Sequence, residues 1–128
     1  MLRICNTIFR KEIKPILQCF PVEKIITCAR KAKTGLGISL GNSATPNSRI
    51  IKIRTTSEKG AFRALYLIVF EHSTSRQILY PILFRPKKDK KIGENFSFKN
   101  KAFKKYYEKN LLLTLEDVRL GNFKEYNL

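Results

Sequence analysis

The amino-acid sequence predicts an α+β fold: an N-terminal helical hairpin packed on a small twisted antiparallel sheet, with a C-terminal helix. Apolar residues recur at helical intervals in the first part of the chain, and from about residue 49 they recur at every second position. Helical spacing returns over residues 98–115, which predicts an amphipathic helix. A chain of 128 residues is long enough for one domain with a single core.

Two segments separated by Pro21 predict the helical hairpin. Residues 8–19 have helical spacing but contain Pro15, so we expect a short or kinked helix there. From Val22 to Lys33, apolar positions alternate with charged ones as they do on an amphipathic helix. The following residues, 34–48, are rich in Gly, Ser and Asn and predict a loop or an extended connection.

Three strands are expected in the middle of the chain. Residues 49–55 alternate isoleucines with basic residues, residues 61–71 form a longer β-rich run, and residues 77–85 form a third. The polar run 73–75 predicts a turn between the second and third strands. Short connections of this kind predict an antiparallel meander.

The charge of the chain indicates a polyanionic partner. It has 26 Lys and Arg against 10 Asp and Glu, a net charge of +16 and a pI of about 10.1. Hydrophobic residues make up 43%, which is enough to build a core, so we expect the excess charge on a folded surface. Nucleic acid is the obvious polyanion for such a surface.

Other chemistries have little support in the sequence. Cys5, Cys19 and Cys28 are odd in number and lack close ligand spacing, which argues against a disulfide framework or a zinc knuckle. The lone histidine, His72, rules out a two-histidine ribonuclease arrangement, and the acids show no paired-carboxylate pattern. The apolar runs are shorter than the roughly 18 residues needed to cross a bilayer. We expect a cytoplasmic protein without metal, cofactor or membrane partner.

Basic residues recur on and beside the expected strands. Lys52 and Arg54 share one face of their strand, about 6 to 7 Å apart, and can meet adjacent phosphate oxygens. An ordinary amphipathic strand with a charged wet face has the same pattern. Arg63, near the start of the next strand, is either a snorkelling edge residue or an anion ligand. The basic run 85–91 is either a solvated loop or a nucleic-acid patch. The residues expected to bind RNA are Arg49, Arg85, Lys87, Lys90 and Lys91.

Several short motifs, in order after the helical pair, resemble the RelE/ParE toxin superfamily, above all its RelE- and HigB-like members. They are Ile51-Lys52-Ile53-Arg54, Gly60-Ala61-Phe62-Arg63-Ala64-Leu65-Tyr66, Ile78-Leu79-Tyr80-Pro81-Ile82-Leu83-Phe84 and Lys87-Lys88-Asp89-Lys90. The resemblance covers residues 8–107 and implies one RelE-like domain over residues 1–128, with about 110–128 as a C-terminal extension. It implies the toxin of a type II toxin-antitoxin module, which cleaves mRNA on the ribosome without a metal and is neutralised by an acidic antitoxin. The alternatives are a ParE-like gyrase inhibitor and a non-catalytic nucleic-acid or ribosome binder.

The resemblance also implies roles for individual residues. RNA supplies its own nucleophile, the 2′-OH, so the enzyme has to align it and stabilise the developing charge. We expect Arg54 and Arg63 to hold the scissile phosphate. We expect Lys52, Lys87 or Lys88 to assist proton transfer. Tyr66 falls at the family's aromatic position, but the strand period turns it away from Arg63. The catalytic set is Lys52, Arg54, Arg63 and Lys88.

Overall fold

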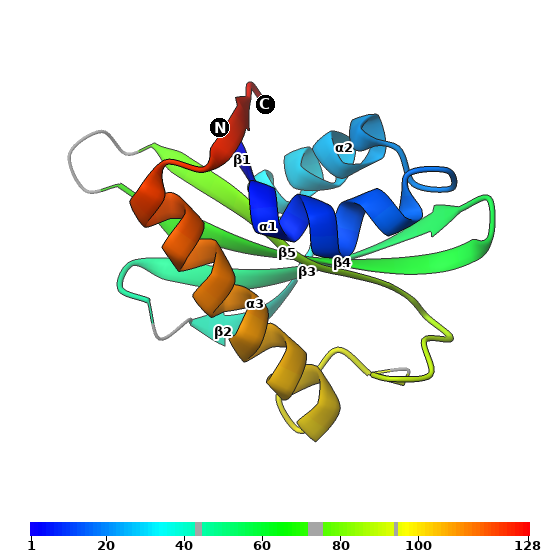
Figure 1. Cartoon of the computed structure of the whole chain (residues 1–128). Helices are drawn as coiled ribbons and strands as arrows, with labels where there is room; N and C mark the ends of the chain where they lie inside the picture. The colour runs from blue at the N-terminus through cyan, green and yellow to red at the C-terminus, as the bar shows by residue number, and fades with distance from the viewer. Residues whose placement is uncertain (43–44, 72–75, 94) are drawn as a thin grey trace.

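The computed structural model describes residues 1–42, 45–71, 76–93 and 95–128 and shows an α+β fold (Figure 1). Within these residues, six strands form one sheet in the order β2-β3-β4-β5-β1-β6. The strands are β1 (Leu2–Cys5), β2 (Ile38–Asn42), β3 (Ser48–Ser57), β4 (Gly60–Phe70), β5 (Gln77–Pro86) and β6 (Phe123–Tyr126). The helices are α1 (Asn6–Ile8), α2 (Val22–Lys33) and α3 (Lys101–Leu120), and α1 continues into a π-helical segment η1 (Phe9–Ile13) and a 3₁₀ turn η2 (Lys14–Ile16).

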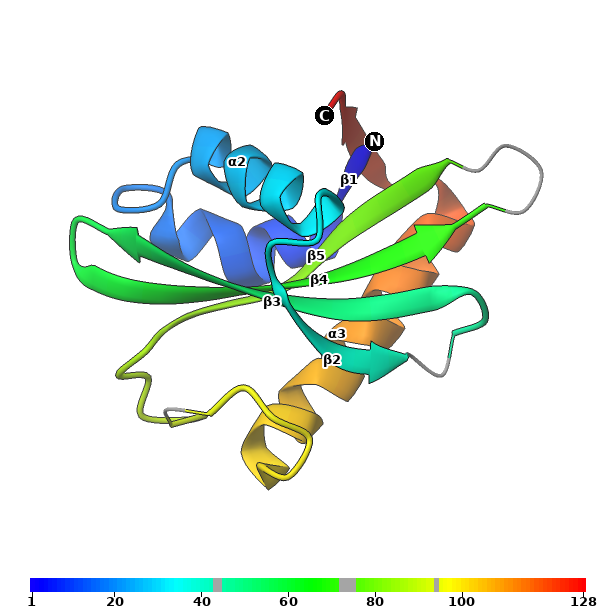
Figure 2. The same cartoon turned by 180° about the vertical axis from the view of Figure 1, so that it is seen from behind.

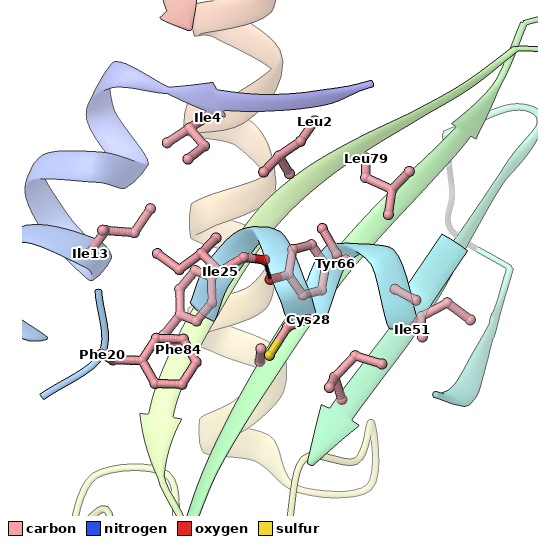
Figure 3. Packing of buried hydrophobic residues seen from close by; sticks show 14 of the residues in the cluster. Leu2, Ile4, Ile13, Phe20, Ile25, Cys28, Ile51, Tyr66, Leu79 and Phe84 are labelled. Atoms are coloured by element: carbon pink, nitrogen blue, oxygen red, sulfur yellow. Dashed lines mark hydrogen bonds between the residues drawn. The ribbon is translucent and has the colours of Figure 1, made fainter. Parts of the chain in front are cut away.

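Helices cover both faces of the sheet, so the molecule has three layers (Figures 1 and 2). Helix α2 and the η1 segment pack on one face, which we call the α2 face, and α3 packs on the other, the α3 face. Alternate residues of each long strand therefore enter two separate cores. Tyr66 lies at the centre of the core on the α2 face, where its hydroxyl donates to the carbonyl of Ile25 at 2.7 Å (Figure 3).

Strands β3, β4 and β5 form the antiparallel meander that the sequence predicts, and their bounds differ from the expected ones by only one or two residues. Gly60 begins β4 with a φ of 106°, a left-handed backbone that L residues rarely adopt. The register places Arg54 of β3 opposite Arg63 of β4, and Arg63 opposite Arg85 of β5. The expected turn at residues 73–75 and His72 lie outside the described residues.

The prediction of an N-terminal helical hairpin on a small antiparallel sheet is wrong. The chain begins with β1, which pairs in parallel with β5 and antiparallel with β6, so the sheet is mixed. With only four residues, β1 is too short to show a clear alternation in the sequence. Its partners lie near residues 79 and 126, far along the chain, where local pattern gives no signal.

The first expected helix, over residues 8–19, is broken into α1, η1 and η2. Pro15 lies within η2 and has no N–H with which to continue an α-helix, which accounts for the early end. Helix α2 has the bounds that the sequence predicts. The C-terminal helix is also present but begins at Lys101, because the Asn100 side chain caps it by accepting from the N–H groups of Ala102 and Phe103.

Two regions expected to be irregular or peripheral belong to the main architecture. Residues 34–48 include β2, which pairs with β3 through a bulge between Ser39 and Gly41. Residues 110–128 supply the second half of α3 and the strand β6. The three cysteines, Cys5, Cys19 and Cys28, are free thiols. None of the helices in the described ranges is long and apolar enough to span a bilayer.

Candidate functional site

A pocket of about 330 Å³ opens near the turn between β3 and β4, and we call it the basic pocket. Three strands place cations around it. Lys52 and Arg54 come from β3, Arg63 comes from β4, and Lys87 directly follows β5. The remaining lining residues in the described part of the chain are Thr55, Ala61, Phe62 and Asn95.

Strand geometry explains why Lys52, Arg54 and Arg63 meet. Ile51 and Ile53 are buried in the core on the α2 face, so the alternation of β3 turns Lys52 and Arg54 to the α3 face. Arg63 faces the same way because it is the cross-strand partner of Arg54. Like charges opposite one another are unfavourable in a sheet, and an anion bound between them relieves the repulsion.

Arg63 is buried in the wall of the basic pocket, with only 4% of its surface exposed. Its Nη2 donates to the carbonyl of Pro86 at 3.0 Å and to that of Gly93 at 2.7 Å. The guanidinium carbon lies 4.2 Å from the centroid of the Phe96 ring, a cation–π contact. Arg63 therefore holds the segment after β5 against the sheet while it adds positive charge to the pocket.

Lys52 is the half-buried amine of the basic pocket. Burial, and then the guanidinium groups of Arg54 and Arg63, lower the pKa of Lys52 below its ordinary value of 10.5. Among the described lining residues there is no carboxylate, imidazole or phenol. A proton-transferring side chain in this lining is therefore Lys52 or Lys87.

The lysine run after β5 divides between the pocket and the solvent. The backbone N–H of Lys87 donates to the carbonyl of Ala61 at 3.0 Å, which continues the pairing with β4 and places Lys87 at the pocket. Lys88, Lys90 and Lys91 are exposed, and none of the three lines the basic pocket. Lys88, which we expected in the catalytic set, therefore lies outside the lining of the basic pocket, and its neighbour Lys87 lines the pocket instead.

Arg85 is engaged in an ion pair, although it was expected to bind RNA. Its Nη1 donates to the carboxylate of Glu12, which is 1% exposed and also accepts from the N–H of Phe84 at 3.2 Å. The guanidinium carbon of Arg85 lies 5.5 Å from the centroid of the Tyr106 ring on α3. Arg85 therefore links η1, β5 and α3. Sequence patterns could not show this, because Glu12 lies 73 residues away along the chain.

Arg49 and Tyr66 both lie away from the basic pocket. Arg49 is exposed, and its guanidinium carbon lies 5.1 Å from the centroid of the Phe70 ring, which packs against the core on the α2 face. Tyr66 faces away from Arg63, as the strand period predicts, and burial raises the pKa of its phenol well above the ordinary value. Tyr66 is therefore a core residue.

The sequence did not single out Asn95 or Phe96. Asn95 lines the basic pocket and Phe96 packs under Arg63, yet both belong to an irregular segment that has no periodic pattern. The nearby Gly93, with a φ of 81°, is a local signal of a turn in this segment.

The basic pocket has to be interpreted from its own geometry. No family model, curated protein or solved structure matches the chain. Four cationic side chains from the described residues surround a space of about 330 Å³, and one of them has a lowered pKa. Such an arrangement can bind a phosphate group and exchange a proton with it or with its neighbours.

Proposed function

We propose that this protein is the RelE-like toxin of a type II toxin-antitoxin module and that it cleaves mRNA on the ribosome. The observation that carries the proposal is the meeting of Lys52, Arg54, Arg63 and Lys87 at one pocket. These residues come from the same short motifs that resemble the superfamily. A concentrated positive field on a rigid sheet favours a phosphodiester and the extra charge of its transition state.

The reaction uses the 2′-OH of RNA as the nucleophile. The neutral amine of Lys52 accepts the 2′-OH proton as the oxygen attacks the adjacent phosphorus and the bond to the 5′-oxygen breaks. Lys87, in its ammonium form, donates a proton to the leaving 5′-oxygen. The products are a 2′,3′-cyclic phosphate and a 5′-OH, so atoms and charge balance without a further reactant.

The arginines have different tasks in this scheme. Arg54 is exposed and free to turn its planar guanidinium toward two phosphate oxygens. Arg63 is held by two carbonyl oxygens and acts through its charge and through the position it gives to the loop after β5. Lys52 suits proton transfer because a lowered pKa gives it a larger neutral fraction than an exposed lysine has.

The proposal is tested by cleavage of mRNA on programmed ribosomes, with the new RNA ends mapped by primer extension. We expect Lys52→Met, Arg54→Ala and Lys87→Ala each to slow cleavage by about 100-fold or more, since each removes a proton-transfer group or a transition-state cation. Lys105→Met, which removes the same charge from an exposed position on α3, is the matched control and should cleave like the wild type.

A 2′-deoxy nucleotide at the mapped cleavage position should abolish the reaction, because the nucleophile is then missing. Wild-type rates in Lys52→Met and Arg54→Ala would overturn the assignment of the pocket. DNA cleavage complexes with gyrase, in the absence of RNA cleavage, would select the ParE-like alternative instead.

A further inference from the structure

A second pocket, of about 310 Å³, adjoins the basic pocket across β3. Lys52 and Arg54 line both pockets, so the two share part of one wall. We call the second one the side pocket. Its other lining residues are Lys31, Leu36, Gly37, Ile38 and Ile53.

The side pocket combines a third source of positive charge with apolar side chains that face water. Lys31 lies in the last turn of α2 and is exposed. Leu36 is 75% exposed and Ile38 is 43% exposed, although both are large apolar residues. The cations suit the phosphates of a single-stranded nucleic acid, and the exposed apolar side chains offer van der Waals contact to the face of an unpaired base.

Close packing at Gly37 holds this apolar pair in place. A Cβ atom at Gly37 would lie 2.3 Å from Cγ2 of Ile51 and 2.8 Å from the carbonyl oxygen of Lys52. The connection from α2 to β2 therefore lies directly on β3 (Figure 2). Only glycine permits this approach, and it places Leu36 and Ile38 beside the shared cations.

The pairing of β2 with β3 explains why the side pocket is open. The pairing starts at Ile38 and Lys52, so the part of β3 from Ile53 onward has no partner from β2. Arg54 is exposed in this part of β3, two residues from Lys52. Because Lys52 and Arg54 line both pockets, an extended chain can pass from one pocket to the other along a positive surface. The rise of a strand separates the two side chains by about 6 to 7 Å, similar to the spacing of successive phosphates in an extended nucleic-acid strand.

We propose that the side pocket binds the nucleotide next to the scissile phosphate on the same single-stranded RNA. Its phosphate contacts Lys31, and its base lies on Leu36 and Ile38. This inference rests on the proposed function, because it requires a phosphate of the same RNA in the basic pocket. It defines the substrate as an unpaired strand that extends beyond the cleaved bond, since a base paired in a duplex cannot reach an apolar surface at the edge of the sheet.

The experiment compares a short ligand that fills only the basic pocket with a longer one that extends into both pockets. A 2′-fluoro nucleoside 3′-monophosphate offers one phosphate to the basic pocket, and a 2′-fluoro octanucleotide extends into both pockets without being cleaved. Binding is measured by fluorescence anisotropy with the labelled octanucleotide and by its displacement with the mononucleotide. Lys31→Ala should weaken the octanucleotide about fivefold and lower its salt slope by about 0.7, with no change for the mononucleotide.

Two further variants test the apolar part of the side pocket. Leu36→Ser combined with Ile38→Ser should weaken the octanucleotide about tenfold, because the base loses its apolar contact, and leave the mononucleotide unchanged. Both side chains are exposed, so the double substitution removes little core packing. Gly37→Ala should have the same selective effect, since the added Cβ displaces the connection from β3. Lys33→Ala removes a charge from the same helix outside the side pocket and is the matched control.

The outcomes separate the inference from the proposed function. If Arg54→Ala weakens both ligands, while Lys31→Ala and the double serine variant bind the octanucleotide like the wild type, the inference is overturned and the proposed function stands. An equal loss in Lys33→Ala and Lys31→Ala would also overturn it, since the effect would then be one of general charge. Failure of the wild type to bind either ligand would also overturn the inference, whereas the proposed function is overturned only by the cleavage assay on programmed ribosomes.

Discussion

Lys52 has an environment in the basic pocket that an exposed surface lysine lacks. It is half-buried, and its pKa is lowered by burial and by two neighbouring arginines. A lysine with a lowered pKa loses its proton at lower pH, so its neutral amine becomes available closer to the physiological range. The same feature makes the proposed base identifiable from the pH dependence of the reaction.

We predict that the single-turnover cleavage rate rises with pH and levels off above the lowered pKa of Lys52. Arg54→Gln removes one cause of the lowering, so that pKa rises and the rising limb moves to higher pH, in addition to any loss of rate. Lys52→Met should remove the limb and slow the reaction by about 100-fold or more. If the cleavage rate of Lys52→Met rose with pH as that of the wild type does, proton transfer would belong to another group.

At the residue scale, the sequence predicts the cations of the site better than their individual roles. Strand alternation was enough to place Lys52 and Arg54 on one face, and the meander brought Arg63 beside them. The burial of Arg63 and the pairing of Arg85 with Glu12 depend on contacts between distant segments. A local pattern contains no information on such contacts.

Among the elements, β5 shows how side chains can replace a missing strand. Strand β1 pairs with β5 near Leu79 only, and further along this edge the carbonyl of Ile82 and the N–H of Phe84 bond to side chains. Asn110 of α3 donates to the carbonyl at 2.8 Å, and Glu12 accepts from the N–H at 3.2 Å. The backbone groups are thereby satisfied although no strand covers them.

We predict that Asn110→Ala lowers the free energy of unfolding by about 1 to 3 kcal/mol. The substitution leaves a buried carbonyl without its donor and removes the acceptor of the Lys11 ammonium, which lies 2.7 Å from Oδ1 of Asn110. Urea-induced unfolding followed by circular dichroism measures the change. Lys109→Ala, at the exposed neighbouring position, should stay within about 0.5 kcal/mol of the wild type. An equally small effect of Asn110→Ala would show that water replaces its bonds.

The long elements were predictable and the short ones were not. Strands β3, β4 and β5 and helix α2 each contain enough residues for their apolar period to be recognised. Strands β1 and β6 have four residues each, and the partners that they pair with lie far away along the chain. The expected hairpin failed for this reason, since it was built from helix patterns without the strand that precedes them.

For the whole molecule, the two ends of the chain lie side by side in the sheet (Figures 1 and 2). Strand β1 lies between β5 and β6, with Leu2 opposite Tyr126 and Cys5 opposite Phe123. Arg3 strengthens the connection, since its guanidinium contacts the carboxylate of Glu125 at 2.9 Å and the ring of Phe123 at 4.6 Å. The last residues are therefore part of the sheet itself.

We predict that removal of residues 122–128 lowers the free energy of unfolding by about 2 kcal/mol or more. The deletion removes the ladder to β1 and the contacts of two half-buried aromatic residues. Lys124→Ala keeps the strand and is the control, with an expected change below about 0.5 kcal/mol. Denaturant unfolding of the two variants checks the difference, and equal stabilities would show that β6 contributes little.

The position of β1 between β5 and β6 has a consequence for biosynthesis. Residues 2–5 are translated before residues 123–126, so the outer edge of β1 stays unpaired until β6 has been made. A nascent chain therefore cannot close this side of its sheet until Tyr126 has emerged from the ribosome that makes it. This side of the sheet is therefore completed only after the elements between β1 and β6 have been translated.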